Sequence, residues 1–391
     1  MALRKIFDSR LAPSAPAQRG DVDRSGVWRF RELVLPTIAD ADIVTQWEGN
    51  TPLLQRDAVE KWAGGSELWL KHEGHNPTGS FKDRGMTVVL SNAKRIGARA
   101  VSCASTGNTS ASLAAYAALA GIPAVVLVPS GQIALGKLAQ TLAYGARTLM
   151  VRGDFDACLR IAREASEKLG VYLVNSINPF RIAGQTTIVL DLLQQLGWQA
   201  PDWIVVPAGN LGNTAAFGVA LRQARETGLI DSSPRLAAVQ AEGAAPFARS
   251  FRSGFAKRES VHAETVATAI KIGDPASYER GVRAIRENSG VVLDVPDAEI
   301  LEAKAVIDAS GIGCEPASAA SVAGVRRMVR DGIIRKSERV VAVLTGHILK
   351  DPGILIDYHK DAKKPLANPP LEIEASVDAV ARVLQSSGRP Q

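Results

Sequence analysis

The sequence has few cysteines and no apolar leader, and each absence excludes a class of protein. Its 391 residues contain only three cysteines, Cys103, Cys158 and Cys314, which are widely spaced and form no CxxC pair. This pattern argues against a disulfide framework and a structural zinc site, and it is typical of a reducing compartment. Residues 1–20 contain charged side chains and no long apolar run, so we expect no secretory signal and a cytoplasmic protein.

The sequence also lacks a membrane span. Its longest stretch without a charged residue runs from Ala100 to Gly136. A transmembrane helix needs about 20 continuous apolar residues, but Gly121-Ile122-Pro123 interrupts this stretch. We therefore expect a buried helix over Ser110–Ala120, followed by a buried strand over Ala124–Val128, and no membrane partner.

Strong charge of one sign is absent as well. The formal net charge is +6, and no block of Lys and Arg or basic stripe with interleaved aromatic residues occurs. Nucleic acid is therefore an unfavourable partner, whereas a small positive excess suits an anionic small molecule. Hydrophobic residues at 46% and charged residues at 22% are typical of a globular protein that is long enough for two domains.

Short apolar runs alternate with segments of helical period, which predicts an α/β protein with mainly parallel sheets. In such folds, ligands bind at the carboxyl ends of the strands. The predicted strands are Leu68–Leu70, Ala100–Cys103, Ala124–Val128, Thr148–Val151, Tyr172–Val174, Trp203–Val206, Arg235–Val239 and Val340–Leu344. The predicted helices include Met86–Ile96, Asp156–Leu169, Gly184–Leu196, Thr214–Thr227 and Pro316–Asp331.

The most informative segment is Asn76-Pro77-Thr78-Gly79-Ser80-Phe81-Lys82-Asp83-Arg84-Gly85. The spacing of Ser80 and Asp83 is a capping-box signal, which places Lys82 in the first turn of a helix. The helix dipole and Arg84 should then lower the pKa of Lys82. A neutral lysine amine can form a Schiff base with an aldehyde. An isolated lysine is more often a solvated surface residue, so the interpretation depends on its surroundings.

Three loops each follow a predicted strand. Ser105-Thr106-Gly107-Asn108-Thr109 offers hydroxyl and backbone N–H groups to an anion such as a carboxylate, although a plain helix cap is an equally good reading. Gly209-Asn210-Leu211-Gly212-Asn213-Thr214 lets a phosphate approach the backbone, but it is not GxGxxG, so a dinucleotide fits poorly. Thr345-Gly346-His347 is weak evidence by itself.

A reactive lysine, a phosphate-binding loop and a carboxylate-binding loop are the parts of a pyridoxal-phosphate enzyme. Between about Arg29 and Pro352 the chain resembles the threonine synthases, in the family with the tryptophan synthase β-subunit fold (fold type II). Within the lysine segment, Ser-Phe-Lys-Asp-Arg-Gly resembles threonine synthases more than threonine dehydratases. The other matching segments are Arg29–Leu33, Glu48–Leu53, Ser105–Thr109, Ala134–Gln140, Asn175–Arg181, Cys314–Ser318 and Leu344–His347.

The resemblance implies a role for each matching residue. Lys82 would hold the cofactor as a Schiff base and move protons. Asn108 would bond the ring hydroxyl of the cofactor and Thr345 its pyridine nitrogen. The cofactor phosphate would be bound by Gly209, Asn210, Gly212, Asn213 and Thr214. The substrate carboxylate would be bound by Ser105, Thr106 and Thr109, and the substrate phosphate by Asn175, Ser176 and Arg181, with Lys137 as a further cation. No metal is expected.

The resemblance also implies the reaction of O-phospho-L-homoserine with water to give L-threonine and phosphate. It implies a homodimer whose subunit has two α/β domains. The large domain would comprise residues 1–90 and 175–391, and the small domain residues 91–174. Because Thr345 offers a neutral hydroxyl to the pyridine nitrogen, the ring should be a weaker electron sink than one that is paired with a carboxylate.

Two residues depart from the family pattern and keep alternatives open. His75 stands where an apolar residue is expected, and Ile348 where glycine is more usual. Ile348 could merely repack its loop, or it could change the substrate to another phosphorylated amino acid such as O-phosphoserine. A catalytically silent ligand-binding relative is a more remote alternative, because such a protein would not need Lys82.

Overall fold

The computed structural model describes residues 2–11, 21–130 and 135–386. Contacts divide the chain into two compact units, Met1–Asp351 and Pro352–Gln391. The first unit holds both β-sheets, and the second holds helices α14 (Pro352–Lys360) and α15 (Val377–Ser386). None of the helices in these described ranges is both long enough and apolar enough to cross a membrane.

The larger sheet has six strands in the order β1-β2-β10-β7-β8-β9. All neighbouring pairs are parallel except β1 and β2. The strands are β1 (Leu53–Leu54), β2 (Glu67–His72), β7 (Trp203–Pro207), β8 (Arg235–Ala241), β9 (Val291–Val295) and β10 (Arg339–Leu344). The sequence pattern missed β1, which has two residues, and β9, which lies at the sheet edge and is only partly buried.

The smaller sheet has four strands in the order β5-β4-β3-β6, and all of its pairs are parallel. Its strands are β3 (Val101–Ala104), β4 (Ala124–Pro129), β5 (Arg147–Val151) and β6 (Tyr172–Leu173). The prediction of an α/β protein with mainly parallel sheets is therefore confirmed. The uncharged stretch also forms the predicted buried helix and strand, α5 (Asn108–Ala120) and β4.

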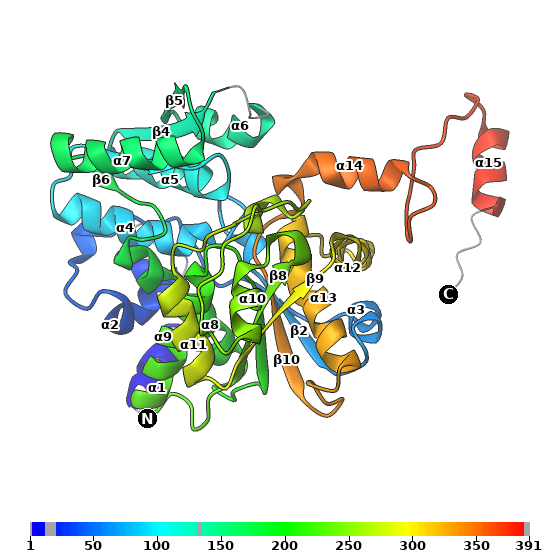
Figure 1. Cartoon of the computed structure of the whole chain (residues 1–391), viewed down its shortest axis with the longest axis horizontal. Helices are drawn as coiled ribbons and strands as arrows, with labels where there is room; N and C mark the ends of the chain where they lie inside the picture. The colour runs from blue at the N-terminus through cyan, green and yellow to red at the C-terminus, as the bar shows by residue number, and fades with distance from the viewer. Residues whose placement is uncertain (1, 12–20, 131–134, 387–391) are drawn as a thin grey trace. The chain divides into compact units, whose positions relative to one another are not determined.

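Helices cover both sheets, with α5 and α7 against β3 and β4, and α13 against β10 (Figure 1). The remaining helices of the first unit are α1 (Ala2–Ser9), α2 (Arg31–Val34), α3 (Asp57–Trp62), α4 (Lys82–Arg95), α6 (Leu135–Ala143), α7 (Phe155–Leu169), α8 (Pro179–Gln195), α9 (Gly212–Glu226), α10 (Pro246–Arg252), α11 (Tyr278–Glu287), α12 (Asp297–Ala309) and α13 (Pro316–Arg330).

Helix α8 begins five residues before the predicted start because Asn178 caps it. The Asn178 side chain accepts a hydrogen bond of 3.0 Å from the Phe180 N–H, and Pro179 occupies the first helical position. Helix α4 begins at Lys82, as the motif around the lysine predicted, and four residues before the periodic segment Met86–Ile96. Apolar periodicity alone misses both first turns, because the periodic apolar residues begin only after them.

Two glycines bring these first turns together. A Cβ atom on Gly184 of α8 would lie 1.9 Å from the carbonyl oxygen of Arg84, and one on Gly85 of α4 would lie 2.8 Å from that of Arg181. The two helices therefore contact backbone to backbone, which only glycine allows. This contact brings the helix turn that carries Lys82 next to the turn that carries Arg181.

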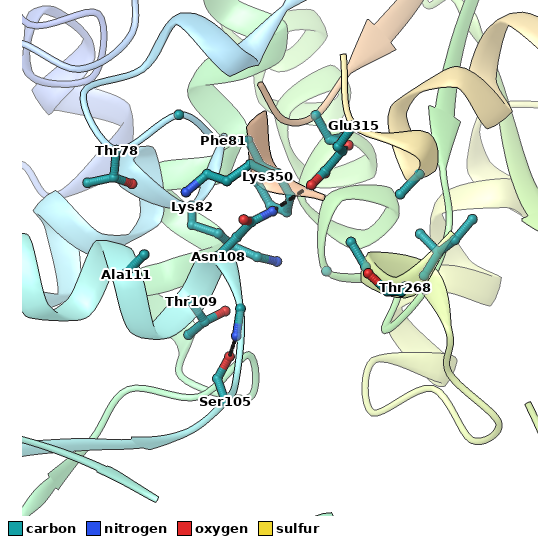
Figure 2. A pocket seen from close by; sticks show the side chains of 18 of the residues that line it. Thr78, Phe81, Lys82, Ser105, Asn108, Thr109, Ala111, Thr268, Glu315 and Lys350 are labelled. Carbon is teal, nitrogen blue, oxygen red and sulfur yellow. Dashed lines mark hydrogen bonds between the residues drawn. The ribbon is translucent and has the colours of Figure 1, made fainter. Parts of the chain in front are cut away.

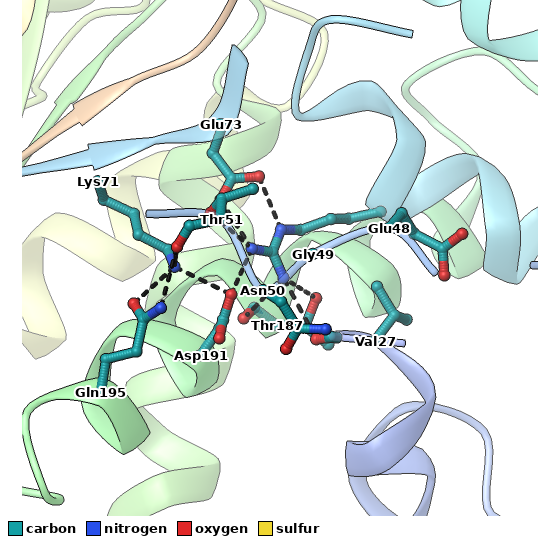
Figure 3. A network of polar contacts seen from close by, with 12 residues as sticks. Val27, Glu48, Gly49, Asn50, Thr51, Lys71, Glu73, Thr187, Asp191 and Gln195 are labelled. Atoms are coloured by element: carbon teal, nitrogen blue, oxygen red, sulfur yellow. Dashed lines mark hydrogen bonds and ion pairs between the residues drawn. The ribbon is translucent and has the colours of Figure 1, made fainter. Parts of the chain in front are cut away.

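A buried ionic network fixes the same crossing (Figure 3). Arg84 of α4 pairs with Glu73 at 2.7 Å and with Asp191 of α8 at 2.6 Å. Asp191 also pairs with Lys71 of β2 at 2.9 Å and with Arg29 at 2.6 Å. Burial alone would raise the pKa of Asp191, but the three cations hold it well below its usual value. The network therefore ties α4, α8 and the sheet together.

Candidate active site

One cavity of about 1030 Å³ lies at the carboxyl ends of strands from both sheets. Of the residues singled out in the sequence, those that line it follow β2, β3, β6, β7 and β10: Lys82, Ser105, Thr106, Asn108, Thr109, Asn175, Ser176, Arg181, Gly209, Asn210, Gly212, Asn213 and Thr345. Segments far apart in the sequence thus converge, because parallel strands bring their carboxyl ends to one edge.

Two of the predicted site residues, Thr214 and Lys137, are not among the described residues that line the cavity. Thr214 is fully buried in the first turn of α9 and is not among the described residues that line the cavity. Lys137 belongs to α6, but its side chain lies outside the part of the chain that the structure describes.

Lys82 begins helix α4, as predicted, but the predicted capping box is wrong. The Asp83 carboxylate instead accepts hydrogen bonds from the Thr78 N–H at 2.7 Å, the Thr78 hydroxyl at 2.6 Å and the Ser112 hydroxyl at 2.5 Å. Since Ser112 lies on α5, this carboxylate fastens the lysine loop to the helix that opens with Asn108. Burial raises the pKa of Asp83 to about 6.

The pKa of the Lys82 amine is low, but not for the predicted reason. Burial, together with the charge of Arg181, lowers the pKa of Lys82 to about 7, and Glu315 opposes the shift. Arg84, which was expected to act on Lys82, points into the ionic network instead. The amine lies 4.0 Å from the centre of the Phe81 ring. A substantial fraction of this lysine is therefore neutral near pH 7, which suits a nucleophile or a base.

Arg181 is a buried cation without an acidic partner among the described residues. Its side chain is 1% exposed, and its Nη1 donates to the Val174 carbonyl at 3.4 Å. Nε and Nη2 have no hydrogen-bond partner within the described part of the chain. Burial lowers the pKa of Arg181 to about 10, so the guanidinium stays charged at neutral pH. Two free donors on a buried cation are well suited to an anion.

The loop before α9 is a second part of the cavity with features that suit an anion. Leu211 has a φ of +62° and turns the chain into the helix at Gly212. A Cβ on Gly209 would lie 3.0 Å from the Ile270 backbone, so this wall of the cavity has no room for a side chain. The Thr214 hydroxyl is buried and lacks a partner among the described residues. The backbone N–H groups at the start of α9 and the positive end of the helix dipole favour a phosphate at this loop.

Glu315 is a site residue that the sequence analysis did not single out. It lines the cavity, is 4% exposed, and accepts a hydrogen bond from Asn108 Nδ2 at 3.0 Å (Figure 2). It also accepts one from Thr345 Oγ1 at 3.3 Å. Burial raises the pKa of Glu315. The one available signal was its place directly before Pro316, where an acidic residue reads as an ordinary partner of a helix N-terminus.

Lys350 also lines the cavity and was missed. Its ammonium donates to Gln140 of α6, and burial lowers the pKa of Lys350. By contrast, Cys103 is buried behind the Ser105 loop, where burial raises the pKa of its thiol to about 12. Among the described residues, no group of His, Cys, Asp and Glu side chains is placed to hold a metal ion.

Comparison with known families identifies the class of this site. The family model described as "Pyridoxal-phosphate dependent enzyme" matches residues 44–346, which is most of the chain. Among solved structures, the chain superposes on maize serine racemase with a TM-score of 0.70 at 21% identity, covering 86% of this chain and 97% of that one. It superposes on the processed threonine deaminase isoform 2 of Solanum lycopersicum with a TM-score of 0.69 at 20% identity, covering 93% and 94%. The fold is therefore fold type II of the pyridoxal-phosphate enzymes.

Curated relatives narrow the family. The chain is 46% identical to the threonine synthase of Methanosarcina acetivorans over 360 residues, covering 92% of this chain and 86% of that protein. It is 44% identical to the threonine synthase of Methanocaldococcus jannaschii over 365 residues, covering 92% and 87%. The chain belongs to the threonine synthase family of pyridoxal-phosphate-dependent lyases.

The side chains of the cavity fit pyridoxal phosphate. A lysine with a lowered pKa can condense with the aldehyde of the cofactor, and the loop at Gly209 can hold its phosphate. The Thr214 hydroxyl is unpartnered among the described residues, but it does not line the cavity, so the fit rests on the loop itself. Arg181 remains available for a second anion, because its free donors belong to a different helix.

Proposed function

We propose that this protein converts O-phospho-L-homoserine and water to L-threonine and phosphate. The observation that carries the proposal is the pairing of Lys82 with two separate anion sites in one cavity, Arg181 and the loop at Gly209. One site suits the phosphate of the cofactor. The other leaves a buried, charged fork for a phosphate that belongs to the substrate.

The proposed contacts divide the substrate between the elements of the cavity. Ser105, Thr106 and Thr109, in the loop after β3 and at the start of α5, hold the substrate carboxylate with hydroxyl and N–H donors. Arg181, with Asn175 and Ser176 beside it on the cavity wall, holds the substrate phosphate. Asn175 is itself fixed, because its side chain exchanges two hydrogen bonds of 3.1 Å with the Ala104 backbone.

Lys82 Nζ is the base and acid of the proposed reaction. When bound, the cofactor withdraws electrons from the substrate carbon that loses a proton. Lys82 takes the proton from Cα, and further transfers remove a proton from Cβ and expel phosphate from Cγ. A proton is then added to Cγ, water adds its hydroxyl at Cβ, and a proton returns to Cα. A base with a pKa near the working pH is suited to both giving and taking protons. Arg181 stabilises the charge that the departing phosphate gathers.

The alternative substrate, O-phosphoserine, depends on Ile348 and His75. Ile348 is not among the described residues that line the cavity, and a Cβ on Gly313 would lie 3.0 Å from its Cδ1. This packing supports a repacked loop rather than an altered substrate pocket. His75 is exposed and does line the cavity. The observations therefore favour the homoserine ester and leave His75 as the residue to vary.

The test is phosphate release by cofactor-loaded protein from O-phosphohomoserine and from O-phosphoserine, with the amino-acid products identified. Threonine and phosphate from the homoserine ester alone are expected. Lys82→Ala should abolish turnover and the visible absorption band of the bound cofactor, while Lys94→Ala on the same helix should change neither. Turnover of O-phosphoserine alone would replace the proposal with the alternative, and a loaded protein that turns over neither ester would favour the silent relative.

We further propose the subunit organisation that the resemblance implies. Residues 91–174 form a small domain inserted between residues 1–90 and 175–391, which is supported by the origin of the four-stranded sheet entirely within residues 101–173. We also propose a homodimer in the cytoplasm, a proposal that rests on the resemblance to the family. Light scattering of the purified protein tests the dimer, and fractionation of its host cells tests the compartment.

A further inference from the structure

Glu315 connects the two side chains assigned to the ring hydroxyl and the ring nitrogen of the cofactor. Its Oε2 accepts from Asn108 Nδ2 at 3.0 Å, and its Oε1 accepts from Thr345 Oγ1 at 3.3 Å. Asn108 opens helix α5 beside the small sheet, whereas Thr345 directly follows β10 of the large sheet. A single carboxyl group therefore holds residues from both halves of the cavity.

The backbone is built around this carboxyl group. A Cβ on Gly346 would lie 2.4 Å from Glu315 Cδ, so the carboxyl group occupies space that any side chain at position 346 would need. The Glu315 N–H donates to the Gly346 carbonyl at 3.0 Å. The Ser318 hydroxyl adds further contacts to the same segment. It accepts a hydrogen bond of 2.9 Å from the Gly346 N–H and lies 3.1 Å from Thr345 Oγ1. The position of Glu315 is thus fixed from several directions.

We propose that Glu315 is a positioning residue that takes the hydroxyl proton of Thr345 into a hydrogen bond and thereby presents the Thr345 oxygen as an acceptor to the ring nitrogen of the cofactor. This inference rests on the proposed function, which assigns Thr345 to that nitrogen. Glu315 itself acts through Thr345 and Asn108.

The argument follows from counting protons. A threonine hydroxyl has one proton and two acceptor lone pairs. If the proton points to Glu315, only lone pairs are left for the ring nitrogen, and a protonated nitrogen is then favoured. Both carboxyl oxygens accept a hydrogen bond, Oε1 from Thr345 and Oε2 from Asn108, which is the pattern of an ionised carboxylate. The charge of the carboxylate further strengthens Thr345 as an acceptor.

Through this arrangement the neutral Thr345 hydroxyl favours a protonated ring nitrogen, as a carboxylate beside that nitrogen would. A protonated ring is the stronger electron sink, which the removal of two substrate protons requires. Several groups that face Glu315 favour its ionised form, since Asn108 and Thr345 donate hydrogen bonds to it and Lys350 is a nearby cation, with a contribution from Lys82 when its amine is protonated. Burial opposes them, and the pKa of Glu315 is raised overall. The contacts to Asn108 and Thr345 therefore matter for keeping the carboxylate in place.

The test measures the ring nitrogen directly, without substrate. The protein is loaded with pyridoxal phosphate labelled with ¹⁵N in the ring, and the ¹⁵N chemical shift is recorded for the wild type and for Glu315→Gln. We expect a protonated shift in the wild type and a move toward the unprotonated shift in the variant, because an amide keeps the shape but loses the charge. With O-phosphohomoserine, kcat should fall on the order of 100-fold, as for a lost electrostatic contact.

Ser318→Ala is the matched control, because it removes a neutral contact to the same hydroxyl and should leave the ring nitrogen protonated. An unprotonated nitrogen in the wild type would overturn the inference by itself, even if Glu315→Gln failed to fold. An unchanged shift in Glu315→Gln, or an equal change in Ser318→Ala, would also overturn it. The ¹⁵N shift is measured on the resting protein, so it tests this inference separately from the proposed reaction. The ring nitrogen can be unprotonated in a protein that makes threonine, and it can be protonated in a protein that does not.

Discussion

Arg84 and Asp191 form an ion pair of 2.6 Å between two side chains that are completely buried. The pair joins α4 to α8 near the two glycines where these helices touch, close to the turns that carry Lys82 and Arg181. The lysine and the arginine of the site are therefore held together by contacts that face away from the cavity. The contact between α4 and α8 therefore sets how close Lys82 and Arg181 lie in the cavity.

Removing the charge of Asp191 should destabilise the fold. Asp191→Asn leaves Arg84, Lys71 and Arg29 without their shared carboxylate, which typically costs about 3–5 kcal/mol when a buried pair is broken. The pKa of Asp191 is lowered in the folded state, so its stabilising contribution is present above the unfolded pKa and is lost as the pH falls. Urea unfolding at neutral and acidic pH measures both effects.

Glu164→Gln is the control for this prediction, because Glu164 makes only exposed pairs with Arg160 and Lys168. The Glu164→Gln variant should unfold at nearly the same urea concentration as the wild type, because exposed pairs are screened by solvent. Equal losses in the two variants would mean that the buried network does not stabilise the protein.

Cofactor uptake by the apoprotein should follow the ionisation of Lys82. Because its pKa is lowered to about 7, the neutral amine grows with rising pH, and the rate of uptake should rise through a midpoint near pH 7. Arg181→Gln removes a charge that lowers this pKa, so the midpoint should move to higher pH. Stopped-flow absorbance measures the rate. The exposed arginine variant Arg163→Gln should leave the midpoint where it is, and a shared shift would refute the assigned cause.

For substrate binding, the two unpartnered N–H donors of the Arg181 guanidinium should matter more than its positive charge. Arg181→Lys keeps a cation but loses the two unpartnered donors, Nε and Nη2. Hydrogen bonds to charged groups contribute about 1.5–3 kcal/mol, so KM for O-phosphohomoserine should rise roughly 10- to 100-fold. Steady-state kinetics separate KM from kcat. Inorganic phosphate should raise the melting temperature of the wild type and not of the variant, and an unchanged KM would place the substrate phosphate elsewhere.

A methyl group at position 346 should displace Glu315. The Cβ of Gly346→Ala would lie 2.4 Å from Glu315 Cδ, and such overpacking typically costs about 1–3 kcal/mol. Thermal unfolding should show the loss, and the cofactor spectrum should change with it. Gly353→Ala is the matched control, since a Cβ there has no described atom within 4 Å. A stable variant with an unaltered spectrum would show that the carboxyl group adapts freely.

The sequence predicted most of the strands because β2, β3, β4, β7, β8 and β10 are apolar runs that are buried on both faces. It also predicted which loops supply the cavity, since each loop has its own local signal of glycines and hydroxyls. It missed β9 because an edge strand that is exposed on one side carries an acidic residue. It misread Asp83, whose spacing fits a cap although the side chain reaches Ser112 of another helix.

The sequence by itself determined the chemistry of the local segments, namely a lysine at a helix start and two loops able to bind anions. Only the tertiary structure decided which groups surround that lysine. Arg84, its neighbour in the chain, turns away to Asp191, while Arg181 and Glu315 approach it from distant segments. The reason is physical: burial and charge act through space, and the distances between these groups depend on how close α4 and α8 can approach at Gly85 and Gly184.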